Sequence, residues 1–236
     1  MTRALAAAAT LLAMVALAPP ARAQDLLDQG IFLITRDGAE IGREEFAIQA
    51  TPGSQGRPGV RAVATDRYRE REVRAALELT GDHAPLAYQV DVTVAGRLSE
   101  RLSLQAGRGR FALRIVTSSG EVAREFPAPP GAVVLDDDGF DQFYFVPRPS
   151  GDGAVAVNLV RPREKRVVPG EVRADGADTV VVGGRPTPAL KFVLTIAGGA
   201  GGAGTREFWF TPSGSLLRIA VPSTAVTATR ASLPQR

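Results

Sequence analysis

The chain has no cysteine, one histidine and only two lysines among its 28 basic residues. Without cysteine we expect neither a disulfide bond nor the lipid anchor of bacterial lipoproteins, which is attached to a cysteine directly after the signal. The single histidine excludes a metal site built on two imidazoles. His83 also lies in the turn-like segment Gly-Asp-His-Ala-Pro, and no G-x-S-x-G elbow is present. The sequence therefore offers no Ser-His-Asp arrangement.

Long apolar runs are also scarce, and the one that is present lies at the start, in residues 4–18. It follows Arg3 and ends at two prolines and an Ala-Arg-Ala segment, a pattern typical of a secretory signal peptide cleaved after Ala23. The run is shorter than the ~20 residues that a membrane anchor needs. We therefore expect residues 1–23 to be a signal peptide and 24–236 a single all-β domain, periplasmic, without a lipid anchor and not membrane-spanning after cleavage.

Charge of one sign is not in excess either. Removing Arg3 and Arg22 with the signal leaves 26 basic residues against 25 acidic ones. A nucleic-acid-binding domain would show a clear basic excess. Nucleic acid is therefore not an expected partner.

What the sequence does contain is a repeated hairpin pattern. In residues 30–50, Phe32 and Ile34 alternate with Leu33 and Thr35, an Asp-Gly turn follows, and Phe46 and Ile48 lie on the return. Similar alternation with polar turns every 8–12 residues continues to the end, and helical periodicity is absent after the signal. The pattern predicts an all-β fold, an antiparallel meander of about a dozen strands, curled into an open barrel or two packed sheets.

Some segments carry more specific predictions. Residues 163–174 and 178–183 are predicted to be paired strands, followed by a Gly-Gly turn. The run of charged residues at 66–72 is predicted to place Arg67, Arg69 and Arg71 on one strand face. Residues 133–146 fit either a short helix or a pair of strands, and the pattern does not decide between them.

Three motifs together resemble a family of exported, β-rich bacterial proteins of unknown function. They are Ile41-Gly42-x-Glu44 in the first hairpin, Pro85-Leu86-x-Tyr88 at a strand start, and an aromatic-Trp209-x3-Ser213-Gly214-x-Leu216-Leu217 segment near the end. The resemblance spans almost the whole predicted mature chain, and it implies no catalytic residues. A looser resemblance in design links the chain to the periplasmic lipoprotein carriers, whose curved antiparallel sheet holds acyl chains.

Two motifs suggest ligands but fit ordinary loops better. Residues 199–204 match G-x-G-x-x-G, yet a strand-like segment follows where a dinucleotide site needs a helix. The Asp136-Asp137-Asp138 run lacks the alternation and the late glutamate of a calcium loop. We expect no cofactor and no bound metal.

The function that the sequence favours is binding or carrying of an apolar or amphipathic ligand in the envelope, such as a lipid. Phe192 and Trp209 are the candidate apolar contacts, and Arg67 and Arg69 the candidate contacts for an anionic head. The aromatic residues as a group are more typical of a core than of a cleft.

Two alternatives remain open at this stage. The protein could be a structural or interaction module whose sheet edges meet an envelope protein. It could also be a hydrolase that uses carboxylates alone, although no pair stands out among the 25 acids. We expect no enzymatic activity and assign no catalytic residue.

Overall fold

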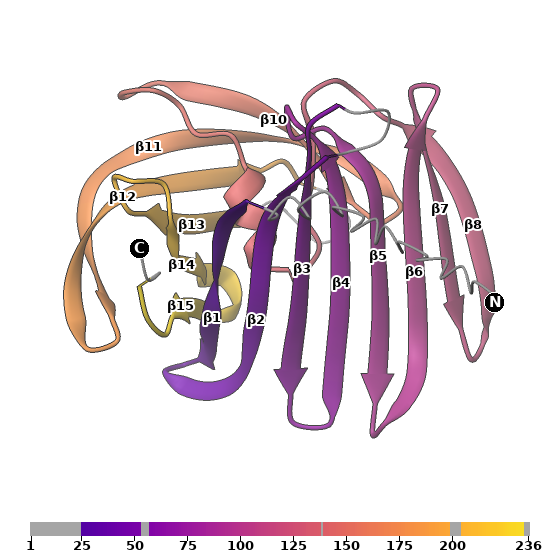
Figure 1. Cartoon of the computed structure of the whole chain (residues 1–236), viewed down its shortest axis with the longest axis horizontal. Helices are drawn as coiled ribbons and strands as arrows, with labels where there is room; N and C mark the ends of the chain where they lie inside the picture. The colour runs from indigo at the N-terminus through magenta and orange to yellow at the C-terminus, as the bar shows by residue number, and fades with distance from the viewer. Residues whose placement is uncertain (1–24, 53–56, 138, 199–203, 234–236) are drawn as a thin grey trace, which may run out of the picture.

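The computed structural model describes residues 25–52, 57–137, 139–198 and 204–233. The predicted signal peptide and most of the 199–204 motif lie outside these ranges. The described chain is all-β (Figure 1). Its elements are β1 (Leu26–Arg36), β2 (Ala39–Thr51), β3 (Gly59–Tyr68), β4 (Arg71–Thr80), β5 (Pro85–Val94), β6 (Arg97–Gly107), β7 (Arg110–Thr117), β8 (Gly120–Pro127), β9 (Ala132–Val134), η2 (Asp141–Phe145), β10 (Ala154–Arg161), β11 (Arg166–Val182), β12 (Arg185–Ile196), β13 (Gly204–Phe210), β14 (Leu216–Val221), η3 (Pro222–Thr224) and β15 (Val226–Arg230).

All fifteen strands belong to one sheet in the order β8-β7-β6-β5-β4-β3-β2-β1-β15-β14-β13-β12-β11-β10-β9. Every pairing is antiparallel except that of β9 with β10, which is parallel. The first and last strands, β1 and β15, pair in the middle of the sheet, and β8 and β9 are its two edges. The predicted all-β meander is confirmed. Of the two predicted arrangements the sheet adopts the open barrel, with fifteen strands where about a dozen were predicted.

The sheet rolls up but does not close. Strands β1–β8 form the wall nearest the viewer in Figure 1, and β10–β15 curve behind it. Strand β9 lies against β5, and β8 approaches β11, so the two ends of the sheet overlap without pairing. Right-handed twist between neighbouring strands makes a flat sheet of this length unfavourable, and rolling buries one face.

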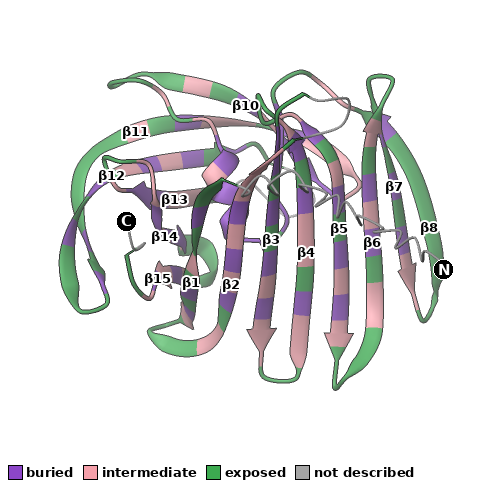
Figure 2. Cartoon of the chain, in the orientation of Figure 1, coloured by how far each residue is buried: buried purple, intermediate pink, exposed green. Residues whose placement is uncertain are grey.

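Alternation along the strands decides which face is buried. Phe32, Ile34, Phe46 and Ile48 are at most 5% exposed and point into the roll, while their neighbours face outward. Figure 2 shows the same alternation along β3 to β6. The turn between β1 and β2 has positive φ at Asp37 and Gly38, as the Asp-Gly signal predicts. Burying this one continuous face is the main source of stability.

Two predictions for individual strands are wrong. Residues 163–174 and 178–183 do not pair with each other but lie in the single strand β11, which pairs with β12 along its length. A register shift between Ala174 and Ala177, with positive φ at Gly176, bends the strand there. The glycine at this bend looks like a turn signal when only the sequence is considered.

The charged segment 66–72 is likewise not one strand face but a hairpin. Tyr68 ends β3, Arg69 takes a positive φ of 46°, and Arg71 begins β4. Arg67 is therefore opposite Glu72, and the two form an ion pair. A non-glycine residue at positive φ leaves little trace in a sequence, which is why the position of this turn could not be predicted.

Residues 133–146 adopt neither predicted alternative alone. Val133 and Val134 belong to β9, a loop follows, and η2 is a single 3-10 turn. This segment, here called the plug (residues 135–137 and 139–146), lies inside the roll between the front wall and the strands behind it (Figure 1). Its aromatic residues fill the interior; Phe143, for example, packs against Phe208. The plug also forms one wall of the site described next.

Candidate functional site

The plug is fastened to the sheet by a buried carboxyl group. Glu44 of β2 is 0% exposed and accepts two backbone hydrogen bonds, from Phe140 N at 2.8 Å and from Asp141 N at 2.7 Å. Residues at the start of a helical turn have no intrahelical partner for their N–H groups. Glu44 supplies the acceptors that this turn lacks.

Two further acids surround Glu44. Asp66 is its cross-strand partner on β3, and Asp141 begins η2; they are 1% and 3% exposed. Burial, followed by the nearby carboxyl groups of Asp66 and Asp141, raises the pKa of Glu44 well above its ordinary value. Burial also raises the pKa of Asp141 to about 7. In this acid cluster (Glu44, Asp66 and Asp141), Glu44 and Asp141 therefore hold protons more tightly than exposed acids do.

A second buried network holds the other end of the plug. Asp136 accepts a hydrogen bond from the Tyr88 hydroxyl of β5 at 3.1 Å and is ion-paired with Arg163. Gln142 donates to the same hydroxyl at 3.0 Å and accepts from Asp136 N at 2.6 Å. Arg163 also reaches Glu100 of β6 at 3.0 Å. Because Arg163 follows β10 and Glu100 belongs to the opposite wall, this pair ties the two ends of the roll together.

Beside the plug lies a cavity of about 600 Å³. One part of its wall is apolar and comes from the plug, β1 and β15; Ile34, Phe140 and Val226 are examples. Cavities of this size that are largely apolar with a few polar groups are typical of small-ligand sites. The remaining lining residues are Arg36, Ile41, Tyr68, Arg69, Arg71, Leu135, Asp136, Asp137, Gly139, Phe143, Arg161, Arg206, Val221 and Thr224.

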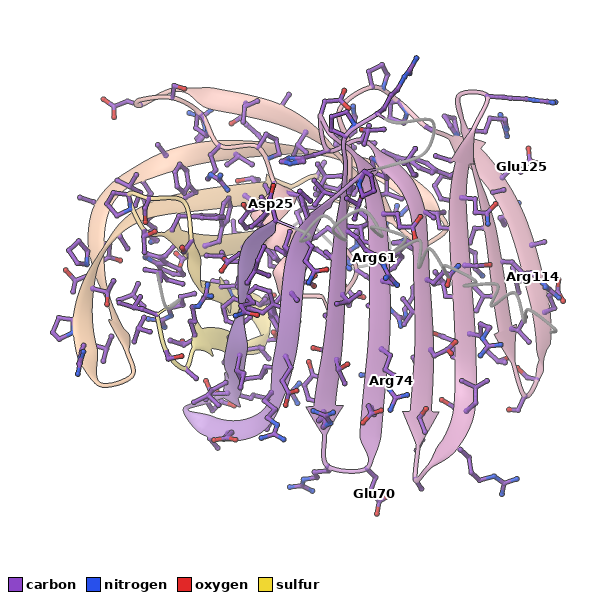
Figure 3. The ribbon with its side chains drawn as sticks, in the orientation of Figure 1. Asp25, Arg61, Glu70, Arg74, Arg114 and Glu125 are labelled. Carbon is purple, nitrogen blue, oxygen red and sulfur yellow. The ribbon has the colours of Figure 1, made fainter. Side chains whose placement is uncertain are left out.

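Five arginines from four separate segments meet at this cavity, and we call them the arginine cluster. They are Arg36 at the end of β1, Arg69 in the β3–β4 turn, Arg71 at the start of β4, Arg161 at the end of β10 and Arg206 in β13. Glu70, labelled in Figure 3, marks the β3–β4 turn. The cavity thus combines an apolar wall with concentrated positive charge.

Of the two candidate arginines, Arg69 lines the cavity and Arg67 does not. Arg67 lies one residue before the end of β3 and is ion-paired with Glu45 at 2.9 Å and Glu72 at 3.2 Å. Because the chain turns at Arg69, the side chains of Arg67 and Arg69 lie in different surroundings.

The candidate aromatic residues lie away from the cavity lining. Phe192 is in the core, where it stacks on Phe208 with ring centroids 5.5 Å apart. Trp209 points to the opposite face of the sheet, where it packs in a small second cluster with Val180 and Leu217. Its indole N–H donates to Asp178 at 2.7 Å. The aromatic residues that the cavity wall does contain are Tyr68, Phe140 and Phe143.

The acid cluster was missed by sequence reasoning, although a signal for it exists. Glu44 shares its strand face with Phe46 and Ile48, and Asp66 follows Ala62 and Ala64 on the same face of β3. An acid that continues an apolar alternation is predicted to point into the core. Only the register of β2 with β3 shows that the two acids are opposite each other.

Among the described residues, no three or more His, Cys, Asp or Glu side chains are arranged so that they could hold a metal ion, and no helix is long and apolar enough to cross a membrane. Asp136 and Asp137, considered above as part of a calcium loop, are instead engaged by arginines: Asp136 by Arg163 and Asp137 by Arg161. Asp138 lies outside the described residues. His83 is exposed in a turn with a φ of 65°, and its ring contacts Phe145 edge-on.

Comparisons with known proteins show a similar fold and no close relative. No family model and no curated protein sequence matches the chain. Among solved structures, a β-barrel-like protein of the domain of unknown function DUF1849 from Brucella abortus has a TM-score of 0.55 and 11% identity, over 91% of this chain and 100% of that one. A Bacteroides fragilis protein with a YmcC-like fold gives 0.34 and 11%, over 88% and 95%. The chain therefore shares a β-barrel-like fold with a protein of unknown function.

Proposed function

We propose that the protein is an exported binding or carrier protein that holds an apolar or amphipathic small molecule in the cavity beside the plug. The observation that carries the proposal is the cavity itself, about 600 Å³ in volume and bounded by Ile34, Phe140 and Val226 on its apolar side. An apolar ligand gains free energy by leaving water for such a wall, at roughly 25 cal/mol per Å² of apolar surface.

The acid cluster supports binding better than hydrolysis. Its members Glu44, Asp66 and Asp141 are at most 3% exposed, and none of them lines the cavity. Glu44 is also occupied by the backbone N–H groups of Phe140 and Asp141. A hydrolytic carboxylate pair has to face the scissile bond and a water molecule. We infer that these acids hold the plug that shapes the cavity.

The edge strands give less support to an interaction module. Strand β8 is a free edge, but Glu121, Arg124 and Glu125 place charges along it. Charged edges are a common protection against strand pairing with other chains. Sheet-edge pairing is therefore the second candidate, and failure of ligand binding would favour it.

The test uses mature protein purified from the periplasm and the neutral apolar fluorophore N-phenyl-1-naphthylamine. We expect saturable fluorescence enhancement with wild-type protein and binding weakened at least tenfold by Ile41→Trp, which adds bulk to the cavity lining. The matched control is Val63→Trp, a half-exposed aliphatic residue on the outer face of the adjacent strand β3. No enhancement with wild-type protein, together with a ligand-free mass in native mass spectrometry, would contradict the proposal.

A further inference from the structure

The arginine cluster carries positive charge that the protein does not fully neutralise. Arg161 is ion-paired with Asp137 and, at 3.0 Å, with Glu164. Asp136, the other acid of the lining, is taken up by Arg163. The two acids of the lining are therefore already bound, and they do not balance Arg36, Arg69 and Arg206.

Arg36, Arg69 and Arg206 have no ion pair with any residue in the described part of the chain. Arg36 and Arg69 are exposed at the ends of hairpin strands, whereas Arg206 is half-buried. The side chain of Arg206 donates one hydrogen bond, to the neutral carbonyl of Thr205 at 3.0 Å. A guanidinium has five N–H donors, so most of its hydrogen-bonding capacity remains available.

Arg206 is also destabilised as a cation by its surroundings. Burial, followed by repulsion from Arg161, lowers the pKa of Arg206, and attraction to Asp137 only partly opposes this. Two guanidinium groups that repel each other at the edge of an apolar cavity gain from an anion placed between them. Guanidinium groups also bind the oxygens of phosphate and carboxylate in a bidentate manner.

We propose that the ligand is an anionic amphiphile whose phosphate or carboxylate head binds at the arginine cluster while its chain lies against the apolar wall. Arg206 and Arg161 hold the head inside the cavity, and Arg36 and Arg69 meet it from the exposed side. This inference rests on the proposed binding function and adds the chemical class of the ligand.

The experiment compares four ligands with the same twelve-carbon chain: dodecyl phosphate, dodecanoate, dodecanol and dodecyltrimethylammonium. The three charged ligands are kept below their critical micelle concentrations and dodecanol below its solubility limit. For each ligand we measure the concentration that displaces N-phenyl-1-naphthylamine from the mature protein at low ionic strength. We expect the two anions to displace it at concentrations at least tenfold lower than the alcohol or the cation. The advantage of the anions should shrink in 0.5 M salt, because salt screens exposed charges.

Substitutions of individual arginines show where the charged head of the ligand binds. Arg206→Gln should weaken dodecyl phosphate about tenfold and leave dodecanol unchanged, since only the charged hydrogen bonds are lost. Arg36→Gln and Arg69→Gln, at exposed turns, test the outer contacts without disturbing the core. The matched control is Arg108→Gln: Arg108 is an exposed turn arginine with a φ of 51°, close to the 46° of Arg69, and lies outside the cavity.

The outcomes separate this inference from the proposed function. If all four ligands bind equally, or the cation binds best, the anionic class is refuted while the binding function stands. If none displaces the fluorophore and the fluorophore itself does not bind, the binding function fails. An anion preference unchanged in Arg206→Gln, Arg36→Gln and Arg69→Gln would place the head elsewhere and overturn the inference.

Discussion

Raising the pH should destabilise this protein between about pH 4 and pH 7, because the acid cluster binds protons more tightly in the folded state than in the unfolded chain. The pKa of Asp141 is about 7 in the fold, against an ordinary value of 3.8, and the pKa of Glu44 is also raised. For an acid with a raised pKa, the stabilising contribution is complete below the unfolded pKa. It is lost as the pH rises towards the folded pKa.

The magnitude follows from the size of the shift. Each pKa unit corresponds to about 1.4 kcal/mol, so the Asp141 contribution that disappears between pH 4 and pH 7 is at most about 4 kcal/mol. The raised pKa of Glu44 means that its stabilising contribution is also lost as the pH rises. The contributions of Glu44 and Asp141 are not additive, because the two carboxyl groups interact. His83 acts in the opposite direction, because partial burial of its ring lowers its pKa. The residue as a whole is exposed, so its contribution to stability is small.

The perturbation that isolates the effect is Asp141→Asn. The Oδ1 atom of Asp141 has no hydrogen-bond partner among the described residues, so an amide NH2 group can take its place without breaking a hydrogen bond. We expect the variant to resemble wild type at pH 5 and to be more stable at pH 8, by about 1–4 kcal/mol. The matched control, Asp91→Asn, removes an exposed acid whose pKa is lowered by Arg101, and it should not stabilise the protein at pH 8.

Urea unfolding at pH 5, 6, 7 and 8 measures the free energy of unfolding directly. Trp209 is the only tryptophan and is 5% exposed, so its fluorescence reports loss of the fold, with circular dichroism as a second probe. Wild-type stability that is constant or rises from pH 5 to pH 8 would refute the reasoning. So would an Asp141→Asn variant with the same pH dependence as wild type.

Two further predictions concern backbone contact and buried charge. Gly42→Ala should lower the free energy of unfolding by about 1–3 kcal/mol, because an added Cβ would lie 2.5 Å from the carbonyl oxygen of Arg67. The control Gly107→Ala should change it by less than about 0.5 kcal/mol, because nothing lies within 4 Å of the added Cβ. Equal unfolding midpoints for the two variants would contradict this. Arg230→Ala should cost about 3–5 kcal/mol, because the fully buried Arg230 is ion-paired with Asp28 at 2.7 Å and its loss leaves that acid uncompensated. The double variant Asp28→Leu, Arg230→Met should recover part of the loss in urea unfolding, and a double variant no better than the single one would argue against charge burial as the cause.

Much of the sheet could be predicted because each strand carries its own signal. The alternation of Phe32 and Ile34 with exposed neighbours, and the Asp-Gly turn after them, are local features that specify a hairpin. The same holds for Val90 and Val92 in β5. The roll of the sheet is not a local feature of any strand, and it could be predicted only as a general consequence of twist summed over many strands.

The plug could not be predicted for a related reason. Its backbone is held by side chains distant in sequence, such as Glu44, 96 residues from Phe140, and Tyr88, 48 residues from Asp136. A segment whose hydrogen bonds go to other elements has no periodicity of its own. The arginine cluster was hidden in the same way: Arg69 was selected from a charge run, but its neighbours at the cavity, Arg36 and Arg206, become neighbours only when the sheet rolls.

The pairing of β1 with β15 in the middle of the sheet has a consequence for how the chain can be cut and rejoined. The two sheet edges, β8 and β9, are consecutive in sequence and separated by residues 128–131, whereas the first and last strands lie side by side. A circular permutant opened at 128–131, with β15 joined to β1 by a short linker, would have every strand paired with its neighbours in sequence. Such a chain converts the one long-range pairing of the sheet into a local hairpin, and by the dependence of folding rate on contact order it should fold faster than the natural connectivity.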